Sequence, residues 1–490
     1  MKRLLYRSLA TYLVILLLGL TAFTMFIHGV ISLVRFLLGA TLIAFPVRFG
    51  IDFSIALGAL LALYRVASKR FINVTPSFKL AHEFSEGPWL HHDGDPRTSI
   101  TINWFSPNPS PEHVEIINTR SGISKLVTDK SIRKMHHVQI DNLEPGTIYT
   151  YKITNKDTMS DQELKFRTAA SNFESFAFGV VGDSQNCGGA GVSDWGYRPI
   201  IQSLQAESIS LLFHVGDATD QGNDLRSWHE FLETSRAVIS SIPLHVAAGN
   251  HDTGTRYMKD PSARKAYPDE GANFDYVFGY PYADQDREKD ITPFKNRYYL
   301  VEYPGVIFLM LDTQNSKMAH PSNSQWDWMK KVLARIPDAW WKFVFVHRDL
   351  VRIRMNDAGD RYYVLDKFAK FILPILTKFK VDAIFQGHAH HYASFSWQPA
   401  GNEQNNDKTN AEAGKSLEFI TCGGAGKHLR EHTGIDASTV DLPGFHYQSN
   451  SSHFIVVQVN QSRCIVQAKL PDGTIFHERH ILHRDSRPFD

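Results

Sequence analysis

Five apolar, strand-like runs in the chain each end in side chains that can bind a metal ion. The runs lie at residues 175–181, 210–215, 243–248, 343–346 and 383–386. The residues that follow them are, in order, Asp183, Asp217, Asn250 with His251, His347, and His388 with His390. A single such residue after a strand is usually a turn residue or a helix cap. Five in order predict one site, because ligands of open α/β sheets bind outside the carboxyl ends of the strands.

Helical patterns fill the intervals between these runs. Apolar residues recur at helical spacing in two segments (Leu225, Trp228, Phe231 and Leu232; Trp326, Met329 and Leu333). Such stripes are typical of helix faces that pack on a core. Residues 173–485 are therefore predicted to form one α/β domain that carries the chemistry.

Carboxylates, an amide and imidazoles without thiolates suit Mn, Fe or Zn. The three cysteines lack the spacing of a zinc site and are too few for a disulfide scaffold. One carboxylate can bridge two cations about 3.5–4 Å apart, and the pair clamps a phosphate ester and lowers the pKa of a bridging water. The resulting hydroxide attacks phosphorus in line, and a nearby imidazole protonates the leaving alkoxide.

The residues at these strand ends resemble the ordered signature of the calcineurin-like metallophosphoesterase superfamily. The matching segments are Gly182-Asp183-Ser184-Gln185, residues 216–222, Gly249-Asn250-His251-Asp252, residues 344–347 and Gly387-His388-Ala389-His390. The resemblance implies a metallophosphoesterase β-sandwich flanked by helices, an α/β/β/α arrangement. It also implies the metal ligands: Asp217 as the bridge, Asp183 and His390 for the first metal, and Asn250, His347 and His388 for the second.

The same resemblance implies the residues that act on the substrate. His251 is expected to face the leaving group as an acid, with Asp252 orienting its ring; the alternative is a purely structural histidine. Arg348 follows a metal ligand and is suited to a phosphate oxygen, as a guanidinium matches phosphate geometry. A solvated surface arginine is the alternative. Asn250 is expected to contact the substrate as well as the metal.

Two positions depart from the expected pattern. Gln185 stands where the superfamily usually has a histidine, and its carbonyl oxygen can serve the first metal directly or through water. Asp220 stands where purple acid phosphatases have the tyrosine that binds ferric iron and gives the colour. We therefore expect two divalent or mixed-valence Mn, Fe or Zn ions and no tyrosinate colour.

Residues 73–169 have a different character from the α/β region. Short alternating runs separated by turn signals such as Glu144-Pro145-Gly146 predict a small all-β sandwich. Residues 143–168 resemble the end of a fibronectin type III-like module, and the whole segment is similar to the N-terminal domain of purple acid phosphatases.

Residues 1–70 are predicted to anchor the chain in a membrane. Residues 8–34 contain no Asp, Glu, Lys or Arg, and a second apolar stretch covers residues 36–64, so residues 8–64 are expected to contact the lipid bilayer through one or two transmembrane helices. A cleaved signal peptide is the alternative, although the stretch is too long for one. We expect an integral protein of a plasma or inner membrane, its body cytoplasmic with two spans and extracytoplasmic with one.

The expected function is therefore hydrolysis of a phosphate ester by a membrane-anchored enzyme, with monoesters favoured over diesters. A phosphodiesterase of the same fold and a metal-binding pseudoenzyme or receptor that uses the fibronectin-like module are the rivals. Net charge is only +1, so nothing indicates a nucleic-acid partner.

Overall fold

The computed structural model divides the chain into two units, Met1–His82 and Glu83–Asp490. It describes residues 86–483 of the second unit, without residues 155–162, 187–191, 193–195, 254–271, 280–296, 315–323, 358, 399–415 and 427–433. The predicted membrane anchor at residues 1–70 lies outside the described residues. Within them, no helix combines the length and apolar character that crossing a bilayer requires.

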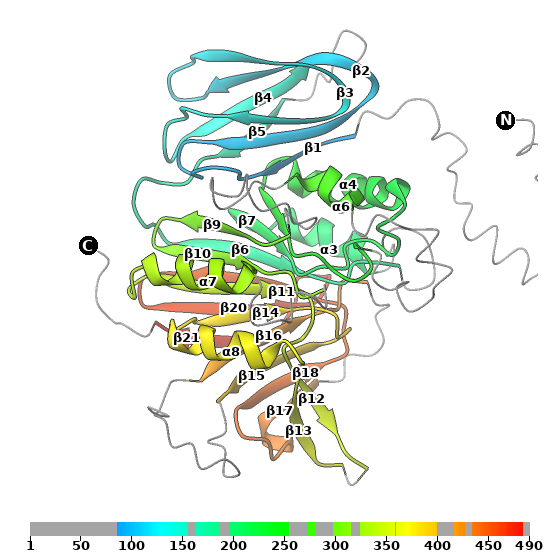
Figure 1. Ribbon diagram of the computed structural model, residues 1–490, viewed down its shortest axis with the longest axis vertical. Helices are drawn as coiled ribbons and strands as arrows, with labels where there is room; N and C mark the ends of the chain where they lie inside the picture. The colour runs from blue at the N-terminus through cyan, green and yellow to red at the C-terminus, as the bar shows by residue number, and fades with distance from the viewer. Residues whose placement is uncertain are drawn as a thin grey trace, which may run out of the picture. The chain divides into compact units, whose positions relative to one another are not determined.

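A five-stranded antiparallel domain comes first in the described part of the chain (Figure 1). Its strands are β1 (Glu86–His91), β2 (Ile100–Asn118), β3 (Ser124–Ile140), β4 (Ile148–Thr154) and β5 (Leu164–Arg167). The first half of the long β2 pairs with β1 and its second half with β4, while β3 pairs along its whole length. The alternating side chains bury one small apolar core, which includes Ile102, Trp104 and Tyr151.

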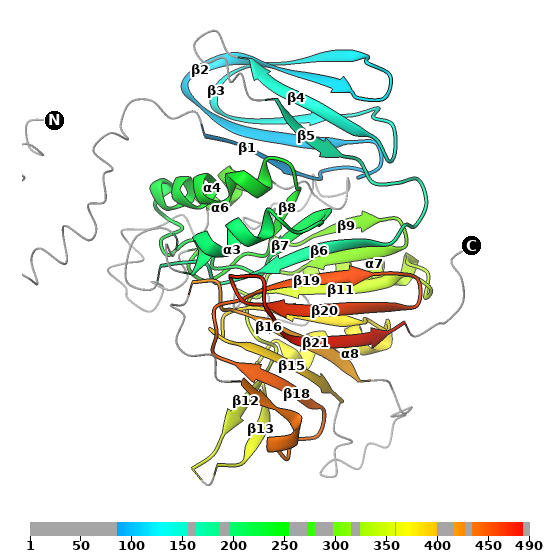
Figure 2. The same cartoon turned by 180° about the vertical axis from the view of Figure 1, so that it is seen from behind.

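Two larger sheets follow and pack face to face (Figure 2). One has six strands in the order β21-β20-β19-β6-β7-β8, and the other has eight in the order β17-β18-β15-β16-β14-β11-β10-β9. Phenylalanines from both sheets fill the space between them: the rings of Phe213 and Phe345 stack with their centroids 4.3 Å apart. Because these strands are covered on both faces, they are continuous apolar runs rather than alternating ones.

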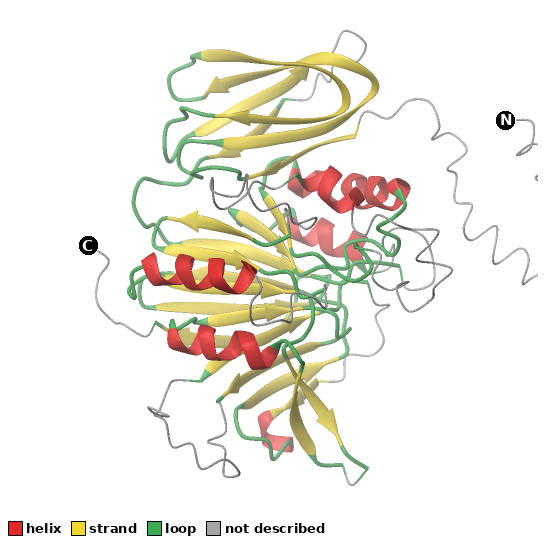
Figure 3. Cartoon of the chain, in the orientation of Figure 1, coloured by secondary structure: helices red, strands yellow, loops and turns green. Residues whose placement is uncertain are grey.

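Helices cover the outer faces of the two sheets (Figure 3). Helices α3 (Tyr197–Leu204), α4 (Leu225–Ile239) and α6 (Ala272–Phe278) contribute to the core that contains the six-stranded sheet. Helices α7 (Ser324–Arg335) and α8 (Ala369–Lys378) pack on the eight-stranded sheet. Both predicted helical stripes are buried in these contacts, and the expected α/β/β/α arrangement is confirmed.

Parallel pairing brings the strand ends that carry the polar residues to one edge of each sheet. Strands β6 (Phe176–Val181), β7 (Leu211–His214) and β8 (Leu244–Val246) are parallel neighbours in the first sheet. Strands β10 (Val306–Met310), β11 (Trp341–Val346), β14 (Ala383–Gln386) and β16 (Leu417–Cys422) are parallel neighbours in the second. The loops after these strands meet where the two sheets come together, and they form the candidate site.

Candidate metal centre

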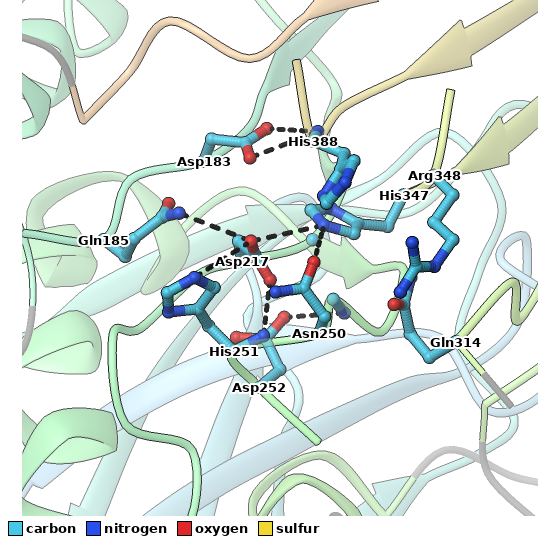
Figure 4. A network of polar contacts seen from close by, with 12 residues as sticks. Asp183, Gln185, Asp217, Asn250, His251, Asp252, Gln314, His347, Arg348 and His388 are labelled. Atoms are coloured by element: carbon cyan, nitrogen blue, oxygen red, sulfur yellow. Dashed lines mark hydrogen bonds and ion pairs between the residues drawn. The ribbon is translucent and has the colours of Figure 1, made fainter. Parts of the chain in front are cut away.

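Asp217, His347 and His388 form the centre of the site, with one ligand atom of each within 4.8 Å of the others. The Nε2 atom of His347 lies 3.2 Å from Asp217 Oδ2 and 3.1 Å from Asn250 Oδ1 (Figure 4). The Nδ1 atom of the same ring lies 2.9 Å from the carbonyl oxygen of Val215, to which it donates its proton. That bond directs Nε2 at the two oxygens, as the outer hydrogen bond of a metal-binding histidine does.

Asp183, Gln185 and His390 lie on the other side of Asp217. Both carboxylate oxygens of Asp183 accept from the backbone N–H of His388, at 3.1 and 2.9 Å, and Asp183 Oδ1 lies 3.5 Å from His390 Nε2. The Gln185 amide satisfies its surroundings when its nitrogen donates to the carbonyl oxygens of Asp183 and Asp217, at 3.1 and 3.0 Å. Its side-chain oxygen then faces the Asp217 carboxylate and the His390 ring, where a cation between them would be a shared partner.

Three of the polar residues at these strand ends have an uncommon backbone conformation, and the loops that carry them approach one another closely. Asp183, Asp217 and His388 have φ values of 56°, 53° and 67°, in the left-handed region that few residues other than glycine adopt. A Cβ atom on Gly249 would lie 2.1 Å from the backbone nitrogen of Asp217. The loops therefore approach too closely for a side chain there, and strained backbone of this kind is common at functional sites.

The electrostatics of the centre separate its charged groups from its neutral ones. Burial raises the pKa of Asp217, but the charges of His347 and His251 outweigh burial and lower it well below its usual range. Burial lowers the pKa of His347, but the Asp217 carboxylate outweighs burial and raises it to about 9. Burial and the nearby His347 lower the pKa of His388 to about 3. The ionised Asp217 carboxylate is thus paired with a protonated His347, whereas His388 is neutral and has its ring nitrogens available to a ligand.

His251 is held by Asp220 and not by Asp252, so the prediction that Asp252 orients the ring is wrong. The ring nitrogen Nδ1 lies 3.1 Å from Asp220 Oδ1 and 3.0 Å from the Asp220 carbonyl oxygen. Burial lowers the pKa of His251, but these contacts and the Asp217 charge outweigh it, and the net shift is upward.

The buried Asp252 carboxylate instead accepts from the backbone N–H groups of Gly249, at 2.9 Å, and Thr219, at 3.2 Å. Burial and the charge of Asp217 raise the pKa of Asp252 to about 7. Asp252 therefore braces the loops after β7 and β8 against each other.

Arg348 lies beside His347, together with Gln314, a residue that the sequence analysis missed. The backbone N–H of Arg348 donates to Thr313 Oγ1 at 2.9 Å, and Gln314 is the next residue along this turn. The turn follows β10, which ends at Met310; the apolar run continues through Leu311, and Asp312 comes next. It is a sixth strand end with a polar residue, and the pattern that found the other five would have found it.

The donor set fits a pair of divalent cations. Two carboxylates, two side-chain amides and three imidazoles are linked by contacts of 2.9–3.5 Å, and the described residues bring no thiolate to the site. Oxygen and nitrogen donors of this kind suit Mn, Fe or Zn.

Comparisons with known proteins match both described domains. The sequence model of the calcineurin-like phosphoesterase family matches residues 176–392, and that of the purple acid phosphatase N-terminal domain matches residues 89–168. The small β-domain therefore matches the purple acid phosphatase N-terminal domain. This match does not support the predicted resemblance to a fibronectin type III-like module.

Similar curated proteins come from Arabidopsis thaliana. Purple acid phosphatase 21 is 25% identical over 264 residues, which are 54% of this chain and 53% of that protein. A protein named "Probable inactive purple acid phosphatase 27" is 23% identical over 327 residues, 61% of this chain and 50% of that protein. The chain thus spans about half the length of these relatives.

Solved structures share the fold. The purple acid phosphatase PPD1 from yellow lupin (Lupinus luteus) seeds superposes with a TM-score of 0.62 at 17% identity, over 81% of this chain and 74% of that one. PhoD superposes with a TM-score of 0.57 at 13% identity, over 81% of this chain and 90% of that one. The chain therefore contains a calcineurin-like phosphoesterase domain at residues 176–392, preceded by a purple acid phosphatase N-terminal domain at residues 89–168.

Proposed function

We propose that the chain is a membrane-anchored phosphatase that hydrolyses phosphate monoesters with two divalent metal ions. The observation that carries this proposal is the convergence of the strand-end ligands around Asp217, with a histidine beside them whose pKa is raised by its contacts with Asp220 and Asp217. Monoesters are favoured because the chain shares the architecture of the purple acid phosphatases, and this preference is an analogy of fold.

The roles that we propose divide the site around Asp217. Asp217 would be a ligand of both metals. Asp183, His390 and the Gln185 oxygen would hold the first metal, and Asn250, His347 and His388 would hold the second. When bound, the two cations neutralise charge on the phosphate and supply the attacking water.

The chain's own groups supply orientation and the proton. The carbonyl of Val215 fixes the tautomer of His347, and the backbone N–H of His388 orients Asp183. The Nε2 atom of His251 lies 3.9 Å from Asp217 Oδ2, at the edge of the ligand cluster, while Nδ1 is held by Asp220. A protonated His251 can therefore donate from Nε2 to the leaving alkoxide.

The membrane location is a proposal from the sequence alone. The apolar stretches at residues 8–34 and 36–64 are long enough to anchor the enzyme beside a bilayer. With two spans the catalytic domain is cytoplasmic, and with one it is extracytoplasmic.

The test is the full chain purified in detergent, stripped of metal with a chelator and reloaded with Mn²⁺ or Zn²⁺. We expect metal-dependent cleavage of p-nitrophenyl phosphate and a bound metal content of two ions per chain. Cleavage of bis(p-nitrophenyl) phosphate alone would show that the chain is a diesterase and not a monoesterase. Binding of two metals without cleavage of either ester would make the chain a pseudoenzyme.

A further inference from the structure

The turn after β10 is rigid and lies against the residue that follows His347. Gln325 of α7 clamps its first residue: its side-chain oxygen accepts from the backbone N–H of Asp312 at 2.8 Å, and its Nε2 donates to the Asp312 carbonyl at 3.0 Å. Asp312 Oδ1 in turn accepts from the backbone N–H of Gln314 at 2.7 Å. With Thr313 bonded to the backbone of Arg348, the turn holds Gln314 at a fixed place beside the metal centre.

The side-chain oxygen of Gln314 is buried without a hydrogen-bond donor from the part of the chain that the structure describes. The residue is only 6% exposed, and its Oε1 has no hydrogen-bond partner among the described residues. Its Nε2 makes one long contact, 3.4 Å to Thr313 Oγ1. A buried oxygen left without a donor has lost its hydrogen bonds to water without replacement, which is unfavourable. Such an atom in a rigid turn indicates a partner that arrives with a ligand or by a small side-chain rotation.

Arg348 can supply N–H donors to this oxygen. Figure 4 shows its side chain running toward Gln314, on the side of the site where Asn250 and His347 lie. Within the described part of the chain, Arg348 forms no ion pair with an acid, in contrast to Arg352, which contacts Asp349 and Asp366. An arginine that is not paired with an acid can bind an anionic substrate without first breaking an ion pair.

The chemistry of the two ester classes decides what this pair recognises. A phosphate monoester has three charged or protonated non-bridging oxygens, whereas a diester has two, because an alkoxy group replaces the third. If the two metal ions bind two of these oxygens, the third oxygen of a monoester would need hydrogen-bond donors from the protein. A guanidinium has five N–H groups, enough to bind that oxygen and an anchoring amide together.

We infer that Gln314 positions Arg348 to bind the third non-bridging oxygen, so that this pair selects phosphate monoesters over diesters. The inference rests on the proposed function and adds the residues that set its substrate class. Gln314 is a positioning residue here, since it acts through Arg348.

The test compares kcat/KM for p-nitrophenyl phosphate and for bis(p-nitrophenyl) phosphate in the metal-loaded full chain. Arg348→Ala is expected to lower the monoester value about 10- to 100-fold, the cost of a hydrogen bond to a charged group, and to change the diester value less than about 3-fold. Arg354→Ala, an exposed arginine of β12 (Val351–Met355), is the matched control and is expected to change neither value.

Gln314 is tested by a double-mutant cycle. Gln314→Ala is expected to lower the monoester value about 3- to 10-fold in the wild-type background and to add nothing in the Arg348→Ala background, because coupled residues are not additive. Gln314→Glu keeps the size of the side chain but places a negative charge beside the phosphate. We expect it to lower monoester selectivity at an unchanged melting temperature.

Several results would overturn the inference. An equal loss of both ester activities in Arg348→Ala would remove its selectivity, and additive effects of the two substitutions would remove the positioning role of Gln314. If the wild-type chain cleaves neither ester, the proposed function fails separately. Calorimetric binding of inorganic phosphate to the metal-loaded chain then decides: binding weakened at least about 10-fold by Arg348→Ala supports the inference, and unchanged binding overturns it.

Discussion

His251 lies between the metal ligands and Asp220, and this position predicts a dependence on the leaving group. Removing a general acid typically costs about 10²–10⁴ in rate when the leaving group needs a proton. We expect His251→Gln to slow hydrolysis of an alkyl phosphate about 100-fold or more, and that of p-nitrophenyl phosphate less than about 10-fold, since nitrophenolate departs without protonation. The measurement is kcat for both substrates.

The same comparison distinguishes Asp220 from Asp252. Asp220→Asn keeps the contact with His251 Nδ1 but removes the charge, so it should show the same leaving-group dependence in weaker form. Asp252→Asn should instead lower the melting temperature, because Asp252 joins two loops. Equal slowing of both substrates by His251→Gln would exclude the acid role.

Asp217 contacts ligands on both sides of the site, since its Oδ2 lies 3.2 Å from His347 Nε2 and 3.3 Å from the Gln185 side-chain amide. Replacing residues that only orient a metal ligand typically costs 10- to 100-fold in metal affinity, so loss of the bridging ligand should cost at least about 100-fold. We expect Asp217→Asn to lose bound metal, measured by elemental analysis, together with activity. Asp327→Asn, an exposed acid of α7 paired with Lys330, is the control and should retain both. A metal content unchanged in Asp217→Asn would contradict the assignment.

Residue identities could be predicted from the sequence where a ligand follows an apolar strand, and less well where packing decides a contact. The candidate metal ligands could all be predicted, because parallel strands place their ends at one edge of the sheet. The partner of His251 could not be derived in this way. Asp220 follows β7 and Asp252 follows β8, and only the folded structure shows that Asp220 contacts the ring while Asp252 accepts from backbone amide groups.

At the scale of elements, buried histidines join the small β-domain to the phosphoesterase domain. His92, next to β1, lies 3.3 Å from His245 of β8 between Nδ1 and Nε2, and His137 of β3 contacts the Tyr276 carbonyl of α6. Burial and the neighbouring His91 lower the pKa of His92 to about 3 and that of His137 to about 4. Burial and then His92 lower the pKa of His245 well below its ordinary value.

This histidine junction predicts that the domain is sensitive to acid. An unfolded histidine titrates near pH 6.5, so below that pH the unfolded chain binds more protons than the folded one and stability falls as pH falls. Each such histidine should cost about 1 kcal/mol of unfolding free energy between pH 6.5 and 5.5. We expect His92→Gln to reduce this loss, measured by urea unfolding at both pH values. His480→Gln, at an exposed position, should leave it unchanged, and an unaltered loss in His92→Gln would contradict the role of the junction.

The strands and helices were more predictable than their contacts. Continuous apolar runs indicated buried strands, and the helical stripes at Trp228 and Trp326 are buried as expected. The junction between domains could not be predicted, because its histidines have no periodic spacing. They meet only when β1 packs beside α4 and β8, which also brings Trp89 and Phe105 into the core of the larger domain.

At the scale of the whole molecule, the chain divides into two compact units, Met1–His82 and Glu83–Asp490. The unit Glu83–Asp490 contains every residue of the metal centre and its own apolar cores. Residues 1–64 carry a net charge of +4 and the apolar stretches, and the remainder carries −3. Composition alone therefore separated the predicted anchor from the body, but it could not decide the number of spans, since Arg48 and Asp52 interrupt the second stretch.

This division predicts that the catalytic unit works without the anchor. A chain of residues 83–490 should fold, bind two metal ions and cleave p-nitrophenyl phosphate within about 3-fold of the full chain, because a domain with its own core can fold alone. The full chain should remain with membranes after carbonate extraction, and the truncated chain should be recovered without detergent. A truncated chain that stays with the membrane would show that the body itself binds lipid. In sealed vesicles, protease digestion of the full chain then reports the side: a body protected inside right-side-out vesicles supports two spans, and a digested body supports one.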